Sequence, residues 1–405
     1  MFIILAAFVG YSLLTFGAIL PNSWFLLDIA FSAAAATVLL VSVIRRKNVD
    51  LASVMALFVI IALPALFHPR LSIGFSAGIF AWVAARRSTT NTLRFLRFLV
   101  LIGVLEATLG LIQYFVSPGW ILGYVNQAYR VSGTLINHNH FAGLLELLIP
   151  PAFGMAYIIA YRFCGMARSY TYLLAAAFMG LALLFSVSRM GILSFLATLV
   201  FVGILLHLQD LQRRIGLIFI VTVGGLVVIA AFWIGIDAIV QRYSLLLGED
   251  AVLREGRIIV FRDTVKMIRA YPAGIGTGNF LDRFREFQTF QPNLLFDHAH
   301  NEYLETAAEW SMPLAALFWA GIIFAIVRAV RLFRTIEKPE QQGVLLACIA
   351  GTLSILIHGL ADFNLEIPSN AMLFFSFVGI LLAMTNEPKS DGKIRERLFS
   401  ESRAS

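Results

Sequence analysis

Charged residues are scarce in this sequence. Only 14% of its 405 residues are charged, whereas 59% are hydrophobic, and the mean hydropathy is +0.83. A soluble domain of this length needs a larger polar surface, so the scarcity of charge excludes that class of protein. Long apolar runs stand in place of the missing charge, and they predict an all-α polytopic integral membrane protein.

The sequence also has no metal-site spacing of cysteines, no cleavable leader pattern and no internal repeat. The two cysteines, Cys164 and Cys348, belong to no spacing typical of zinc or haem sites, and we expect free thiols. The apolar run 1–20 has no basic segment before it and no small-residue cleavage site, so it is expected to remain as a first span. No internal repeat is apparent, which predicts a single membrane domain over residues 1–405.

Apolar runs long enough to cross a bilayer predict about twelve transmembrane helices. They lie near residues 1–20, 24–44, 51–67, 71–85, 94–116, 141–161, 171–187, 190–207, 215–236, 302–328, 343–360 and 370–385. Alternate connections are basic, as at Arg86-Arg87 and Arg213-Arg214. The positive-inside rule therefore places these connections, both termini and the basic tail 386–405 in the cytoplasm. The net charge of +7 reflects this topology rather than nucleic-acid binding.

The remaining connections are expected to face outward, and the largest is the periplasmic loop 237–299. Its eight basic and eight acidic residues nearly cancel, but the basic ones concentrate between residues 254 and 269. Apolar and polar positions there follow helical spacing, which predicts a short amphipathic helix ending at Tyr271-Pro272. All histidines except His207 fall on this outer side.

Two arginines occupy positions where a charged side chain is not expected unless it has a ligand or a partner. Arg257 falls within the apolar arc of the predicted amphipathic helix, an arc formed by Ile258, Phe261, Val265 and Ile268. A guanidinium there would suit two oxygens of a phosphate, and the alternatives are snorkelling or pairing with Asp297 or Glu302. Arg189 lies in a very short connection and should point into the bundle, as an anion ligand or as a cap for helix carbonyls.

The segment 297–305 brings histidines and carboxylates to the point where the outer loop re-enters the apolar part of the chain. At the start of a helix, His300 would project over small residues, and its ordinary pKa near 6.5 suits proton abstraction from a hydroxyl. A capping or core histidine is the alternative. Glu302 or Asp297 could orient its ring, and His298 is the weaker candidate base. Three glutamates share another face of this helix: Glu302, Glu305 and Glu309.

Two more polar segments lie at the predicted outer boundary of the membrane. The first, 133–143, alternates His138 and His140 without paired carboxylates, which gives metal binding little support. The second is 358–368. Gly276-Thr277-Gly278 matches no phosphate-loop fingerprint and is expected to form a turn.

The ordered motifs between residues 130 and 310 together resemble the O-antigen ligase and polymerase family, polytopic glycosyltransferases of bacterial envelope polysaccharide assembly. These motifs are Gly133-Thr134 with Asn137 and Asn139, Ser188-Arg189-Met190-Gly191, Gly256-Arg257 through Pro272, Gly274-Ile275-Gly276-Thr277-Gly278-Asn279-Phe280, and His300-Asn301-Glu302-Tyr303-Leu304 with Glu309. Asp362-Phe363-Asn364-Leu365 also resembles a feature of many members. Two positions depart from the pattern: Phe261 stands where a tryptophan is common, and Ser311 where a glycine usually follows the Glu309 position.

This resemblance implies a GT-C-like enzyme that transfers a glycan en bloc from undecaprenyl pyrophosphate, on the periplasmic face of the bacterial inner membrane. The acceptor hydroxyl would belong to lipid A-core, for a ligase, or to another glycan, for a polymerase. Inversion at the anomeric carbon is expected, with no metal or other cofactor. A transporter or flippase for a lipid-linked glycan is the alternative from another class. It would be expected to place charge near the bilayer midplane and to show duplicated halves.

The resemblance also implies roles for individual residues. Arg189 and Arg257 would bind the donor pyrophosphate, with Arg254 and Arg262 as alternatives, and His300 would be the catalytic base. The supporting positions are Asn137, Asn139, Asp297, Asn301, Glu302 and Tyr303.

Overall fold

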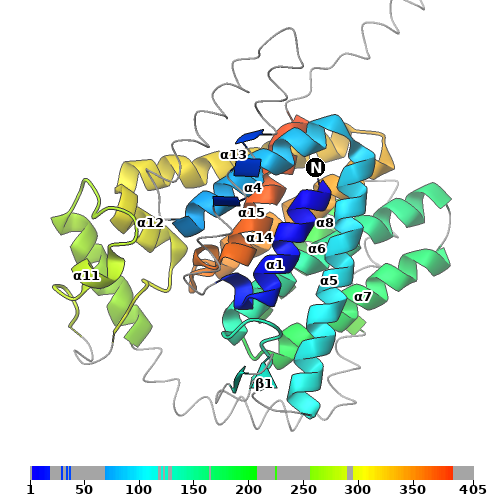
Figure 1. Ribbon diagram of the computed structural model, residues 1–405. Helices are drawn as coiled ribbons and strands as arrows, with labels where there is room; N and C mark the ends of the chain where they lie inside the picture. Colours follow the sequence, from blue (N-terminus) through cyan, green and yellow to red (C-terminus); the bar gives the residue numbers. More distant parts are fainter. Residues whose placement is uncertain are drawn as a thin grey trace, which may run out of the picture.

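Helices make up nearly all of the computed structural model, which is shown in Figure 1. It describes residues 2–18, 69–116, 130–163, 166–207, 256–289 and 295–385, with short pieces at 29–30, 33–34, 36–37, 120–121, 124–125 and 224–225. Among these residues, the only strands are β1 (Trp120–Ile121) and β2 (Tyr124–Val125), which form a two-residue antiparallel pair. The predicted all-α membrane fold is confirmed.

The helices follow the predicted apolar runs. Their bounds are α1 (Phe2–Leu14), η1 (Phe16–Ala18), α4 (Pro69–Arg87), α5 (Thr89–Phe115), α6 (His138–Phe163), α7 (Met166–Phe185), α8 (Arg189–His207), α11 (Phe280–Phe284), α12 (Glu302–Trp310), α13 (Met312–Thr335), α14 (Pro339–His358), η3 (Asn364–Glu366) and α15 (Pro368–Thr385).

Seven helices within the described part of the chain are long and apolar enough to cross a membrane: α5, α6, α7, α8, α13, α14 and α15. The predicted span 51–67, and most of 24–44 and of 215–236, lie outside the described residues, so the total of about twelve stays a prediction. The first predicted span contains α1, which has 13 residues and is shorter than a bilayer requires. The tail 386–405 also lies outside the described residues.

The centre of the bundle is formed by α6, α14 and α15, which are the most buried spans. Glycines let these helices approach one another closely. A Cβ added at Gly154 of α6 would lie 2.2 Å from the carbonyl oxygen of Gly343 in α14, so only glycine fits at this contact. This tight pairing brings side chains of α6 and α14 together across nearly 200 residues of sequence.

The predicted span 302–328 is wrong as a single helix. The structure divides it at Ser311, whose φ of 89° and ψ of 151° lie outside the helical region, into α12 and α13. Pro313 in the first turn of α13 favours a new helix start at this point. The segment after residue 270 completes the break, because the amides of Ile275 and Gly276 bond the carbonyls of Ala308 and Glu309. As a result α12 is a separate helix of nine residues.

The predicted amphipathic helix of the outer loop is confirmed over residues 256–270. Its buried face differs from the predicted arc, because Ile258 is 66% exposed whereas Asp263 and Thr264 are buried. Polar bonds explain this shift: Asp263 accepts hydrogen bonds from the amide and hydroxyl of Thr289, at 2.9 and 2.6 Å. The loop also contains the short helix α11, and Figure 1 shows it beside α12 at one side of the bundle.

Several helix ends meet at one end of the bundle. A Cβ on Gly191 would touch Ala142, and one on Gly143 would touch Asn364, so the first turns of α8 and α6 pack together beside η3. The side chain of Asn370 in α15 donates to the carbonyl of His140 at 3.0 Å. We call this the histidine end, because it contains five of the seven histidines: His138, His140, His298, His300 and His358.

Candidate active site

The ring of Phe363, which follows α14, is surrounded by three imidazoles. His298 stacks on it with 4.2 Å between ring centroids, and His140 and His300 each approach edge-on at 4.9 Å. These histidines come from the start of α6 and from the segment before α12. The aromatic ring therefore gathers imidazoles that lie about 160 residues apart in the sequence.

His300 has an unusual backbone and a polar surrounding. Its φ of 51° lies in the left-handed region, where a non-glycine residue costs about 1–3 kcal/mol. Burial lowers the pKa of His300, the nearby Arg257 lowers it too, and Asp362 opposes both effects. The Nδ1 atom is buried and has no hydrogen-bond partner among the residues that the structure describes. A neutral imidazole in this place can accept a proton.

The Arg257 side chain points toward the protein. The predicted pairing with Asp297 or Glu302 would have required this orientation. Nη1 of Arg257 donates to the carbonyl oxygen of Ala361 at 3.2 Å, in the same segment as Asp362 and Phe363. This bond replaces the predicted pairing with Asp297 or Glu302. The Arg257 charge acts on both His300 and Asp362, so these three groups form one electrostatic cluster.

Asp362 ends a buried polar chain that joins α6 to α14. Nδ1 of His358 lies 2.9 Å from Glu146, and Nε2 lies 3.7 Å from Asp362, which in turn is 3.9 Å from His140. Burial would raise the pKa of Asp362, but His358, His140 and Arg257 hold it below the ordinary aspartate range. The carboxylate is therefore ionised beside His300 and Arg257.

Sequence reasoning missed most of this chain. Glu146 lies inside a predicted span, and an acidic residue in a span indicates a function or a buried partner. The sequence alone could therefore have identified Glu146 as a candidate. The segment 358–368 was recognised as polar, yet neither Asp362 nor His358 was placed at the site. Their partner in α6 is more than 200 residues away, so only tertiary structure reveals the contact.

His298 differs from His300 in its environment. Nδ1 of His298 lies 2.6 Å from Oε1 of Glu305, whose other oxygen accepts the amide of Ala299 at 2.9 Å. Burial lowers the pKa of His298, but the Glu305 carboxylate outweighs it and raises that pKa to about 10. His298 is thus a cation at neutral pH, whereas His300 is neutral.

The three glutamates of α12 are buried and each bonds a backbone amide of a different segment. Glu302 accepts the amide of Leu365 at 2.6 Å, Glu305 that of Ala299, and Glu309 that of Gly278 at 2.8 Å. This arrangement makes α12 the helix that holds the site segments in place. The predicted role of Glu302 in orienting His300 is wrong, because its carboxyl faces the Leu365 amide.

The other predicted supporting residues mainly stabilise backbone. Asn301 caps α12 by accepting the amides of Tyr303 and Leu304, and Asn137 accepts the amide of Asn139 at the start of α6. The hydroxyl of Tyr303 donates to the carbonyl oxygen of Leu356. Asp297 is exposed and lies 3.9 Å from His298, so its predicted role in orienting His300 is also wrong.

The remaining arginines occupy different surroundings. Arg189 is half-buried and begins α8 at the histidine end. Arg262 is exposed, donates to the hydroxyl of Thr289 at 3.1 Å and lies 3.6 Å from Asp263. Five residues separate it from Arg257, which places the two side chains about 140° apart around the helix. Arg254 lies outside the described residues.

Within the described ranges, no group of three or more His, Cys, Asp or Glu side chains has the arrangement of a metal site. The predicted independence from metal and other cofactors stays a prediction. The available chemistry is that of a neutral imidazole, an ionised carboxylate and a guanidinium.

Comparison with known proteins gives one family match. Residues 174–319 match the family model described as O-antigen ligase. This part of the chain is therefore similar to the O-antigen ligase family. The match includes Arg189, Arg257 and His300, whereas Glu146, His358 and Asp362 lie outside it. None of the curated proteins compared with the chain matches it.

Proposed function

We propose that this protein transfers a glycan en bloc from undecaprenyl pyrophosphate to an acceptor hydroxyl, in the manner of an O-antigen ligase. The observation that carries the proposal is the cluster of His300, Arg257 and Asp362 in a chain whose residues 174–319 match the O-antigen ligase model. It combines a base, a cation for the leaving group and a carboxylate that balances their charges.

In the proposed step, the His300 imidazole accepts the proton of the acceptor hydroxyl while the oxygen attacks the anomeric carbon of the donor sugar. The bond from that carbon to the pyrophosphate oxygen breaks, and its electron pair leaves with undecaprenyl pyrophosphate. Attack from the face opposite the leaving group inverts the anomeric configuration. Proton abstraction by a positioned base contributes typically 10²–10⁴-fold to the rate.

The leaving pyrophosphate gains negative charge as the bond breaks. Arg257 would bind it, together with Arg189 from the first turn of α8. Each preorganised contact of this kind lowers a barrier by roughly 3–4 kcal/mol. The cationic His298 adds positive charge on the other side of Phe363. The protein's own cations would therefore neutralise the leaving group without a divalent metal.

The distribution of charge favours a site on the periplasmic side of the inner membrane. The histidine end is opposite the end where α4 and α13 place their basic residues, which include Arg86, Arg87, Arg328 and Arg334. Arg328 donates there to the carbonyl of Thr385, the last residue of α15. By the positive-inside rule the basic end faces the cytoplasm. A flippase would need charge near the midplane, and the clustering at one end argues against that alternative.

A reconstitution assay tests this function. The purified full-length protein is placed in liposomes with an undecaprenyl-pyrophosphate-linked glycan and EDTA, and either lipid A-core or a second lipid-linked glycan is added as acceptor. Transfer to lipid A-core establishes a ligase, and chain extension of the second glycan establishes a polymerase instead. No transfer to either acceptor, combined with movement of the donor between leaflets, would overturn the enzyme assignment.

A further inference from the structure

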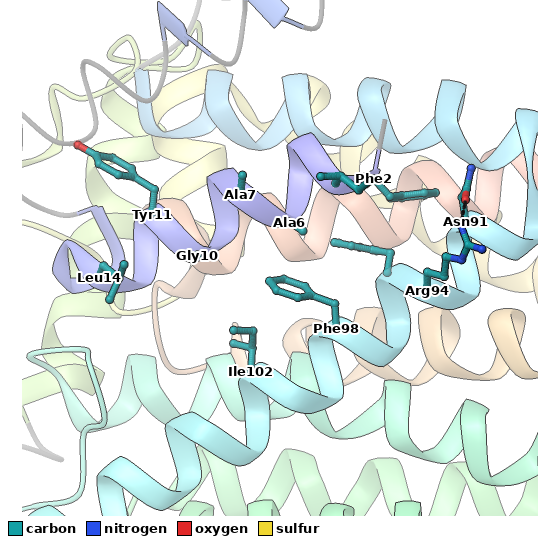
Figure 2. A pocket seen from close by; sticks show the side chains of 12 residues that line it. Phe2, Ala6, Ala7, Gly10, Tyr11, Leu14, Asn91, Arg94, Phe98 and Ile102 are labelled. Atoms are coloured by element: carbon teal, nitrogen blue, oxygen red, sulfur yellow. Dashed lines mark hydrogen bonds between the residues drawn. The ribbon is translucent and has the colours of Figure 1, made fainter.

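A second feature lies between α1 and α5. A cavity of about 730 Å³ separates the two helices, and Figure 2 shows the side chains that line it. The small residues Ala6, Ala7 and Gly10 form the middle of the lining on α1. The other lining residues are larger, namely Phe2, Ile3, Tyr11 and Leu14 on α1 and Asn91, Arg94, Phe95, Phe98 and Ile102 on α5. We call this cavity the α1/α5 groove. It shares no lining residue with the histidine cluster.

The groove has one polar end. Asn91 and Arg94 lie together there in Figure 2, and Nη1 of Arg94 is 3.4 Å from Oδ1 of Asn91. The rings of Phe2 and Phe95, which also line the groove, stack with 4.9 Å between their centroids. Among the described residues that line the groove, Arg94 alone is charged, so the groove presents one cation above a long apolar surface.

The length of the groove matches half of a bilayer. From Asn91 to Ile102 the axis of α5 rises about 17 Å, at 1.5 Å per residue. The hydrocarbon of one leaflet is about 15 Å deep, half of a core of about 30 Å. Arg94 therefore stands where the headgroup of a lipid would lie, and Gly10 and Ile102 stand where its chain would end.

We propose that the α1/α5 groove binds an anionic phospholipid, with the phosphate at Arg94 and one acyl chain along α1 and α5. Two observations favour an anionic phospholipid as the ligand. One is the single cation at the level of the headgroup, and the other is the apolar lining below it. The lipid comes from the leaflet opposite the histidine end. The inference is independent of the proposed glycan transfer and is tested without measuring activity.

The chain offers variants that change the groove without disturbing the packing. Among the residues that the structure describes, no atom lies within 4 Å of a Cβ added at Gly10, so Gly10→Leu fills the groove and also favours the helix. Arg94→Gln removes the cation. Gly321 of α13 is equally open, and Arg331 of α13 is also exposed, so Gly321→Leu and Arg331→Gln are the matched controls.

The measurement is native mass spectrometry of the full-length protein with phosphatidylglycerol and phosphatidylcholine of the same chain length. We expect the wild type to retain phosphatidylglycerol about fivefold better, the effect of one arginine near an anionic lipid. Arg94→Gln should lose that preference, Gly10→Leu should lose retention of both lipids, and the two controls should behave as wild type.

Three results would overturn the proposal. An unchanged preference in Arg94→Gln would mean that the phosphate lies elsewhere. Unchanged retention in Gly10→Leu would mean that the acyl chain does not occupy the groove. Displacement of phosphatidylglycerol by an equal amount of undecaprenyl phosphate would show that the groove selects a polyprenyl chain instead.

Discussion

His298 and His300 stand two residues apart, yet their surroundings hold them in different protonation states. Glu305 keeps His298 cationic, whereas burial and Arg257 keep His300 neutral. A pair of groups whose environments separate their pKa values allows one to carry charge and the other to move a proton. The sequence identified His300 as the candidate base, but the bonded partner of His298 became visible only in the fold.

The first prediction concerns the pH dependence of transfer. A base must be unprotonated, so activity falls when the pH drops below the pKa of His300 in the enzyme. Because that pKa is lowered, the acidic limb of kcat should lie below pH 6.5, the ordinary histidine value. In Asp362→Asn the carboxylate that raises this pKa is gone, and the limb should move to lower pH. A limb above pH 6.5, or a shift upward in Asp362→Asn, would contradict this assignment.

Glu309 provides a prediction about stability. Burial raises its pKa to about 9, and the neighbouring Glu305 adds to the effect. Between pH 4.5 and 9 the folded state therefore binds more protons than the unfolded state, so this residue makes stability decrease as the pH rises. Glu309→Gln keeps an acceptor for the Gly278 amide and should raise the melting temperature at pH 8 by more than at pH 5.

The matched control at this position is Glu309→Ala. It leaves the Gly278 amide without its acceptor and should lower stability by about 1–3 kcal/mol at both pH values. An equal effect of Glu309→Gln at pH 5 and pH 8 would show that the carboxyl is not buried as described.

At the scale of elements, α12 connects the site to the bundle. Its three glutamates bond amides in three segments, and its C-terminal carbonyls receive the amides of Ile275 and Gly276. The periodicity of the sequence predicted a helix here and the grouping of the glutamates. It did not predict the break at Ser311. The apolar run continues beyond this residue, and hydropathy contains no information about backbone angles. Pro313 was the local signal for a new helix start.

The backbone of Ser311 predicts that a glycine at this position stabilises the protein. Its φ of 89° and ψ of 151° lie where essentially only glycine is comfortable, at a cost of about 1–3 kcal/mol for other residues. Ser311→Gly should stabilise the protein by about 1 kcal/mol, after the backbone entropy of glycine is subtracted. Ser311→Ala keeps the strain and should show no gain. Thermal unfolding in detergent distinguishes them, and a less stable Ser311→Gly would contradict the assigned geometry.

At the scale of the whole molecule, the histidine cluster lies at one end of the bundle, and the basic ends of α4 and α13, with Arg86, Arg87, Arg328 and Arg334, lie at the other. Hydropathy and charge in the sequence were enough to predict this division, since all five described site histidines fall on one side and His207 on the other. The contact of Glu146 with His358, and the electrostatic effect of Arg257 on Asp362, depend on how α6, α14 and the outer loop pack. No local pattern contains that information.

Cysteine labelling tests the orientation of the molecule. In a background with Cys164 and Cys348 replaced by serine and alanine, Asp297→Cys introduces an exposed thiol at the histidine end and Arg334→Cys one at the basic end. A membrane-impermeant maleimide should label Asp297→Cys in intact cells with a permeabilised outer membrane. Arg334→Cys should react only after the inner membrane is opened. The reverse pattern would place the site in the cytoplasm.

The most direct test of the account compares glycan transfer by His300→Ala with that by His207→Ala, in liposomes and at matched amounts of folded protein. His207 ends α8 at the opposite end of the bundle and is exposed, so its loss should leave kcat unchanged. Loss of the base at His300 should lower kcat by about 10²–10⁴-fold. Full activity in His300→Ala would contradict the central claim that this histidine takes the acceptor's proton.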